Sequence, residues 1–167
     1  MKRNSLAWLT RGAVIAALYV ALTITPPLNA LSYGQVQFRI SEALNVLAFF
    51  EPAAIPGLFV GCVLANLGSP LGIYDVVFGS LLTLVSAFLI WKIKRPSLAL
   101  LAPVIINAFG VALELNLVLH LPLLLSALFV GIGEAIIVYG LGYPLLLALI
   151  QRKALIRTDI FARKMGN

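Results

Sequence analysis

The stretch LPLLLSALFVGIGEAIIVYGLGYPLLLALI, residues 121–150, carries a single charged residue, Glu134. A helix needs about 20 consecutive apolar residues to cross the hydrocarbon core of a bilayer, so this stretch is long enough to cross it with a strong tilt. A charge at the centre of such a helix costs roughly 2.5–3.5 kcal/mol on insertion scales. The stretch therefore predicts a membrane helix whose one acid has a function.

The composition of the whole chain agrees with a membrane protein. Of the 167 residues, 62% are hydrophobic and 11% are charged, whereas a soluble domain carries about 25% charged residues. The single cysteine, Cys62, lies in an apolar run, so no disulfide can form within the chain and a buried small side chain is its expected role.

Five further apolar segments precede this stretch, and prolines fall at or near most of their ends. The expected fold is all-α: one integral membrane domain, residues 1–167, of six transmembrane helices with a basic cytoplasmic tail at 151–167. The second and third helices are short for a span. A cleaved signal peptide is the alternative for the first segment, but the later segments need no separate targeting signal. The expected helices are 12–28, 38–50, 52–67, 76–93, 98–119 and 121–150.

The basic residues predict the orientation. Cytoplasmic loops of membrane proteins carry an excess of lysine and arginine. With six helices, three basic residues at the N-terminus, three between the fourth and fifth helices and five in the tail all lie on one side, which leaves Arg39 of the 12 on the other. Both termini are therefore expected in the cytoplasm of a multi-pass protein of the cell membrane. The basic tail is expected to touch anionic lipid, and a nucleic-acid surface is an unnecessary explanation.

Four acids remain in the membrane or on its outer face: Glu42, Asp75, Glu114 and Glu134. Together with Arg39 they give this part of the protein a net charge of −3. This sign disfavours an anionic ligand and suits a neutral or cationic one.

Helical spacing places polar groups of the last two helices on shared faces. In the fifth helix, Gly110 is expected to leave room between Asn107 and Glu114. In the sixth helix, Glu134 lies beside Gly131 and Gly133. Each helix would thus bring one carboxylate to a common cavity, although hydrogen bonding between helices is the structural alternative. The two faces are Asn107, Gly110 and Glu114, and Ser126, Val130, Glu134 and Val138.

The start of the second helix carries two opposite charges, Arg39 and Glu42. Their spacing of three predicts a salt bridge that makes the arginine tolerable beside lipid, and contact with a ligand is the alternative. The polar loop before them, residues 29–37, is a candidate lid over a cavity. His120, the one histidine, is expected to be a solvated loop residue.

The absent motifs argue against an enzyme. The sequence has no phosphate-binding glycine loop, no zinc-protease motif, no paired cysteines and no aspartate cluster for a metal, so neither a metal nor a cofactor is implied. An ion channel would need several subunits and a ring of filter groups. A membrane protein that binds a small molecule for transport fits better.

Five segments, in order, resemble the queuosine-precursor transporter family, the QueT-type S components of energy-coupling factor (ECF) transporters. These segments are QFRISEALNVL, AIPGLFVGCVLANL, DVVFGSL, NAFGVALEL and GEAIIVYGLGYPL. The resemblance implies a six-helix protein that binds its ligand near the outer face. It also implies a complex with a transmembrane coupling subunit (EcfT) and two cytoplasmic ATPases, which would hydrolyse the ATP. In that family small residues of the first helix dock on the coupling subunit, and Ala13, Ala17 and Ala21 are the matching residues here, with internal packing as the alternative.

The ligand that the resemblance implies is a 7-deazaguanine such as preQ1 or preQ0. Its guanine edge donates paired hydrogen bonds, and the aminomethyl arm of preQ1 is cationic. We expect Glu134 or Glu114 at the donor edge, Asn107 at a ring oxygen or nitrogen, and an aromatic residue, Phe38, Tyr74 or Phe78, stacked on the ring. Arg39, Glu42 and Asp75 complete the set of candidate binding residues.

Two alternatives remain open from the sequence. An S component for another flat, neutral or cationic vitamin would share every feature except the ligand. A membrane assembly or structural subunit would bind no ligand, and no small molecule would then stabilise it.

Overall fold

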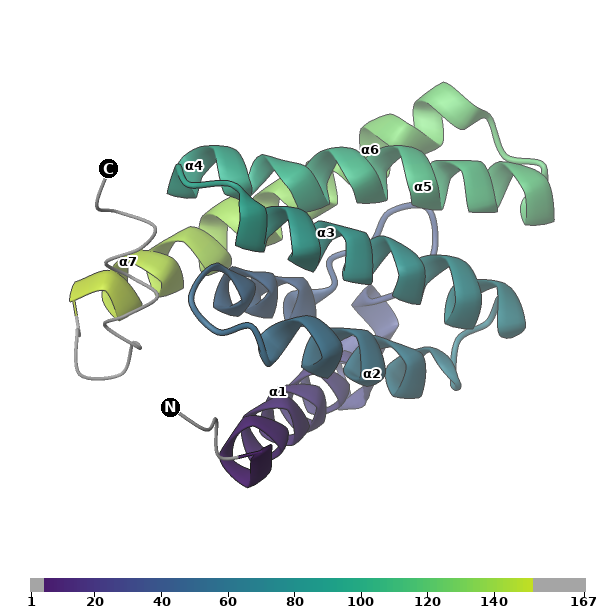
Figure 1. Cartoon of the computed structure of the whole chain (residues 1–167). Coiled ribbons are helices and arrows are strands. Elements are labelled where there is room, and N and C mark those ends of the chain that lie inside the picture. Colours follow the sequence, from purple (N-terminus) through teal and green to yellow (C-terminus); the bar gives the residue numbers. More distant parts are fainter. Residues whose placement is uncertain (1–4, 152–167) are drawn as a thin grey trace.

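A computed structural model describes residues 5–151 of the chain. Within that range the structure is helical and has no strand, which confirms the predicted all-α class. The predicted basic tail, apart from Gln151, lies outside the described residues, as do Lys2 and Arg3. Figure 1 shows the long helices packed side by side as a bundle.

Among residues 5–151, four helical segments are long and apolar enough to cross a membrane. The first is α1 (Ser5–Ile24), and the second joins a π-helical segment, η3 (Asp75–Gly79), to α3 (Ser80–Lys92). The third joins α4 (Pro96–Ala99) to α5 (Leu101–Leu119). The fourth runs through α6 (Leu123–Ile137), the π-helical η4 (Val138–Gly142) and α7 (Tyr143–Gln151).

The second and third predicted helices are indeed short. They correspond to a 3₁₀ helix, η2 (Ile40–Phe49), and to α2 (Ala54–Asn66). Each is about 20 Å long at the usual rise per residue, less than the hydrocarbon thickness of about 30 Å. The six-helix count is therefore not established by length and composition. A further single-turn 3₁₀ helix, η1 (Leu28–Leu31), lies in the first loop.

The short helix η2 lies at the centre of the bundle. It contacts α1, α2, α3, α6, η4 and α7, and eight of its residues, from Ser41 to Phe49, are buried. The large side chains Val46 and Phe49 are fully enclosed and belong to the hydrophobic core. This segment is thus shielded from lipid by the longer helices.

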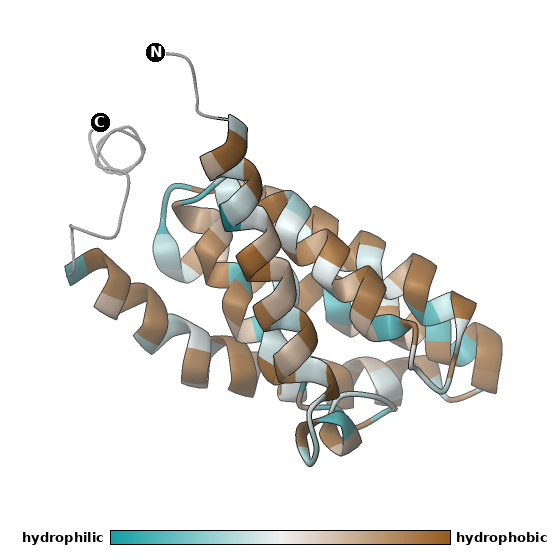
Figure 2. Ribbon diagram, turned by 90° about the horizontal axis from the view of Figure 1, so that it is seen from below, coloured by the Kyte–Doolittle hydropathy of each residue, from teal (hydrophilic) through white to brown (hydrophobic). Residues whose placement is uncertain are grey.

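The outer faces of the long helices are apolar. Leu9, Phe109 and Leu124 are each more than half exposed, and Figure 2 shows hydrophobic colouring along much of these helices. In water such a surface would be an aggregation hazard, whereas a bilayer covers it. The structure and the composition therefore both indicate a multi-pass membrane protein.

Close packing of α1 on α2 depends on two glycines four residues apart, Gly57 and Gly61. A Cβ atom on Gly57 would lie 2.6 Å from the Gly12 carbonyl oxygen, and one on Gly61 would lie 2.8 Å from Tyr19 Cβ. Small residues at this spacing let membrane helices approach closely. The interface therefore uses Gly12 and Ala16 of α1, and Ala13, Ala17 and Ala21 remain exposed on another face.

Candidate functional site

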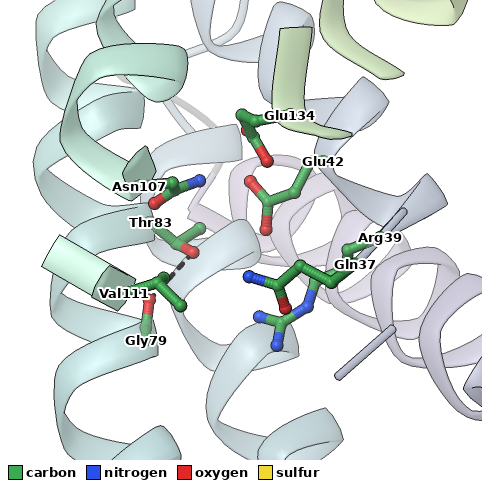
Figure 3. A pocket seen from close by; sticks show the side chains of 8 residues that line it. All are labelled: Gln37, Arg39, Glu42, Gly79, Thr83, Asn107, Val111 and Glu134. Carbon is green, nitrogen blue, oxygen red and sulfur yellow. Dashed lines mark hydrogen bonds between the residues drawn. The ribbon is translucent and has the colours of Figure 1, made fainter. Parts of the chain in front are cut away.

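A small polar pocket lies inside the bundle, and eight residues from the first loop, η2, η3, α3, α5 and α6 line it (Figure 3). Three of them are ionisable, and four of the eight were predicted as binding residues. The cavity volume is about 10 Å³, which is roughly the room that one water needs. The lining residues are Gln37, Arg39, Glu42, Gly79, Thr83, Asn107, Val111 and Glu134.

Arg39 faces the pocket but does not form the predicted salt bridge with Glu42. Its Nε donates to the Ser32 carbonyl oxygen at 3.2 Å, and its guanidinium lies 5.3 Å from the centre of the Tyr33 ring. Among residues 5–151 the ion pair found is Arg11–Glu51, at 2.8 Å. The helical-phase prediction was wrong because Arg39 precedes η2 in an extended conformation. Nor does Arg39 face lipid, since it is buried.

Glu42 is held by neutral donors on both of its oxygens. The Tyr19 hydroxyl of α1 donates to Oε1, and the Asn45 side-chain amide donates to Oε2. All three side chains are buried. The carboxylate therefore has a fixed orientation without a contact ion pair that would cancel its charge.

Glu134 enters the pocket from α6, opposite Glu42. Figure 3 shows the two carboxyl groups directed toward each other, with the Asn107 amide beside them. The Oε1 atom of Glu134 is buried and has no hydrogen-bond partner among the described residues. An acid with an unused acceptor in a polar pocket is a candidate ligand contact.

The face predicted for α6 is confirmed: Ser126, Val130, Glu134 and Val138 are all buried. The neighbouring Gly133 has a specific packing role. A Cβ atom there would lie 2.1 Å from the Gln37 carbonyl oxygen, so this position admits no side chain while the first loop crosses α6. Glycine beside the acid thus brings the loop to the pocket.

The first loop forms a strap, residues 28–39, that joins two sides of the bundle. The Tyr33 hydroxyl donates to the Ala65 carbonyl oxygen of α2 at 2.8 Å, and Gln35 Nε2 donates to Ser126 Oγ of α6 at 2.9 Å. Partial burial raises the pKa of Tyr33, which keeps its hydroxyl protonated as a donor. The strap ends at Gln37 and Arg39, which both line the pocket.

Two predicted acids, Glu114 and Asp75, do not line the pocket. Glu114 is fully buried in α5, and it interacts electrostatically with Asp75, whose carboxylate accepts a hydrogen bond from the Ser69 hydroxyl. The room expected at Gly110 is filled by Leu82, because a Cβ atom on Gly110 would lie 2.3 Å from a Leu82 methyl carbon. These two acids form a separate cluster beyond the pocket.

The three candidate stacking residues also lie outside the pocket lining. Tyr74 and Phe78 are partly exposed on η3 and its N-terminal side, at 49% and 37%. Phe38 is half-buried and approaches Gly133, where a Cβ atom would lie 3.9 Å from a Phe38 ring carbon. Of the three candidates, Phe38 is thus the one that lies between two lining residues, Gln37 and Arg39, and packs beside α6 next to Glu134.

Sequence reasoning missed several residues of the site. Gln37 belongs to the loop predicted as polar, but Gly79, Thr83 and Val111 carried no signal of their own. A π-helical segment ends at Gly79, and such segments are frequent at functional sites. Tyr19 could have been noticed as a tyrosine with a polar end inside an apolar helix, which needs a hydrogen-bond partner when buried.

These features define a class: an all-helical, multi-pass membrane protein with an enclosed polar pocket, suited to small-molecule transport. The family model for the QueT transporter matches residues 9–151. A queuosine precursor transporter QueT from Lactococcus lactis subsp. cremoris (strain MG1363) is 36% identical over 148 residues, which cover 80% of this chain and 87% of the relative. The chain belongs to the QueT transporter family. No solved structure matches it.

Proposed function

We propose that the chain is the substrate-binding S component of an ECF importer that captures a 7-deazaguanine such as preQ1 or preQ0 at the outer face. The observation that carries the proposal is the pocket with two facing acids, Glu42 and Glu134, and the Asn107 amide. This donor and acceptor set matches a purine-like ring with paired N–H donors and an exocyclic carbonyl oxygen. The name of the lactococcal relative supports the same ligand class.

In the proposed complex, Glu134 accepts the paired hydrogen bonds of the guanine edge, and the Asn107 side-chain amide donates to the exocyclic carbonyl oxygen. Phe38 is the proposed stacking residue, because it lies between the lining residues Gln37 and Arg39 and is more buried than Tyr74 or Phe78. Glu114 and Asp75 contribute indirectly, through the packing of α5 against η3. Since a cavity of about 10 Å³ does not hold a bicyclic ring, the strap moves outward when the ligand enters.

Uptake by cells tests this function. In bacteria that lack preQ1 synthesis and their own importer, but keep the enzymes that convert preQ1 to queuosine, expression of the chain with an ECF module should restore queuosine in transfer RNA when preQ1 is supplied. Expression of the chain without the ATPases should not restore it, because the chain itself is not proposed to hydrolyse ATP. If queuosine is not restored even when the chain is expressed with the whole ECF module, the proposal is contradicted.

We further propose six membrane segments with both termini in the cytoplasm, η2 and α2 being two short segments, of which η2 is enclosed by its neighbours. The Arg11–Glu51 ion pair supports this topology, because it joins the start of α1 to the turn between η2 and α2. The Tyr33–Ala65 hydrogen bond likewise joins the first loop to the far end of α2.

Thiol labelling of whole cells tests the topology. A cysteine in place of His120 should react with an impermeant reagent from outside, and a cysteine in place of Lys94 should not. Lys94 precedes α4 and His120 follows α5, so the two residues lie at opposite ends of one membrane segment. Cys62 is buried and provides an unreactive background. The reverse labelling pattern would contradict the proposed orientation.

Coupling to the transport module is proposed to use the exposed alanines of α1. Ala17→Leu should slow uptake by roughly tenfold through weaker association with the coupling subunit, because bulk prevents close helix approach. Ligand affinity of the isolated protein should stay within about twofold, since Ala17 is exposed and does not line the pocket. Gly140→Leu, on an open surface of η4, is the matched control and should leave both uptake and binding unchanged. Equal loss of binding and uptake in Ala17→Leu would mean that this face packs internally.

A further inference from the structure

The pocket contains two acids whose surroundings differ. Glu42 accepts hydrogen bonds on both oxygens, from Tyr19 and from Asn45, whereas Oε1 of Glu134 has no partner among the described residues. A carboxyl group that accepts on both oxygens is suited to the ionised form, because a protonated one must donate from one of them. Glu42 is therefore the better defined negative charge in the pocket.

The nearest positive charge does not neutralise Glu42 by direct contact. Arg39 instead contacts the Ser32 carbonyl, the Tyr33 ring and the Cys62 sulfur, which lies 3.9 Å from Nη1. Glu134 faces Glu42 across the pocket (Figure 3) and adds acceptor capacity. Two facing acids favour a cation between them, because like charges at short range disfavour one another.

We propose that Glu42 binds the cationic arm of the ligand, and that Tyr19 is the positioning residue that orients Glu42 for it. This inference rests on the proposed deazaguanine function and adds a division of roles. Glu134 and Asn107 read the ring, which all ligands of the class share, and Glu42 reads the substituent. The protein accordingly prefers an aminomethyl substituent, an ammonium at neutral pH, over a nitrile.

The Tyr19–Glu42 hydrogen bond joins α1 to η2, next to the interface between α1 and α2. The Tyr19 side chain is fully buried, and its Cβ atom packs against Gly61 of α2. One turn further along α1, the Thr23 hydroxyl donates to Ser41 Oγ at 2.7 Å, whereas the hydrogen bonds to Glu42 found among the described residues come from Tyr19 and Asn45. Thr23 is thus a matched buried residue of the same helix for a control.

Titration of the purified full chain with two ligands, 7-aminomethyl- and 7-cyano-7-deazaguanine, tests the inference. The wild type should bind the aminomethyl compound more tightly. Tyr19→Phe should lower that preference by about tenfold, because a hydrogen bond to a charged group is lost while the aromatic ring stays. Asn45→Leu should act in the same direction, and Thr23→Val should leave the preference unchanged.

A double-mutant cycle separates positioning from general packing. In a Glu42→Gln background, which should itself remove the preference, Tyr19→Phe should have no further effect on the ratio of the two affinities. Equal weakening of both ligands by Tyr19→Phe would show a merely structural role and overturn the inference. If Tyr19→Phe does not fold, the ratio of the two ligand affinities in Asn45→Leu and in Glu42→Gln tests the inference in its place.

The wild type distinguishes failure of the inference from failure of the proposed function. If it binds both deazaguanines with equal affinity, Glu42 does not read the arm and the inference is wrong, although the proposed function stands. If it binds neither compound, the proposed function fails, and the inference fails with it.

Discussion

Glu134→Gln should lower the affinity for a 7-deazaguanine by about 10- to 150-fold. The carboxylate at this position has an oxygen without a partner among the described residues and is directed into the pocket, so it can accept the paired donors of a guanine edge. The substitution removes the charge and one acceptor, and a hydrogen bond to a charged group is worth roughly 1.5–3 kcal/mol. Calorimetric titration of the purified variant measures the loss.

Glu114→Gln is the matched control for this prediction. Glu114 is another buried glutamate of a neighbouring helix, but it does not line the pocket. Its replacement should change affinity by less than about threefold, even if it alters thermal stability through Asp75. An effect of Glu114→Gln as large as that of Glu134→Gln would mean that the ligand lies deeper between α5 and η3, and an unchanged Glu134→Gln would contradict the proposed site.

Locking the strap should abolish most ligand binding. In the structure Gln35 Nε2 lies 2.9 Å from Ser126 Oγ, so cysteines at these two positions can be joined by a short bis-thiosulfonate reagent. Because the closed pocket has a volume of only about 10 Å³, the crosslink removes the open conformer that admits the ring. Apparent affinity should fall by at least about tenfold and recover after reduction.

Two controls make the strap experiment specific. Each single cysteine variant, treated with the same reagent, should bind normally, since Cys62 is buried and cannot serve as the second partner. Saturation with ligand before the reagent is added should instead reduce crosslinking, because the bound ring holds the strap away from Ser126. Normal binding by a fully crosslinked protein would show that the ligand enters elsewhere.

Much of the helical framework follows from local pattern. The long apolar run that contains Glu134 gives a membrane segment that continues to Gln151, and helical periodicity correctly predicts that Ser126 and Val130 share its buried face. The shortness of the second and third helices is also visible in the sequence, because Glu51-Pro52 interrupts the apolar run there. Periodicity and chain breaks are local properties, which a single sequence contains.

The contacts that build the pocket depend on residues far apart in the chain. Helical phase pairs Arg39 with Glu42, but the extended backbone of Arg39 turns it toward Ser32. The space expected at Gly110 is occupied by Leu82 from α3. Neither outcome can be derived from spacing along one helix, because each is decided by which other segment packs against it.

The exposed alanine face of α1 illustrates the same limit. Spacing groups Ala13, Ala17 and Ala21 on one side, but it does not say whether that side meets another helix of the chain. The structure leaves these residues exposed because Gly57 and Gly61 of α2 pack against Gly12 and Ala16 instead. Internal packing was the alternative role for the three alanines, but Gly12 and Ala16 form that internal interface instead.

Direct titration of the purified protein shows whether it binds a 7-deazaguanine. The protein in nanodiscs would be titrated with 7-aminomethyl-7-deazaguanine and, in parallel, with riboflavin, thiamine and biotin. We expect saturable one-to-one binding of the deazaguanine, a raised thermal midpoint in its presence, and no binding of the three vitamins. Binding of one of the vitamins, with no heat and no stabilisation from the deazaguanine, would contradict the proposed function.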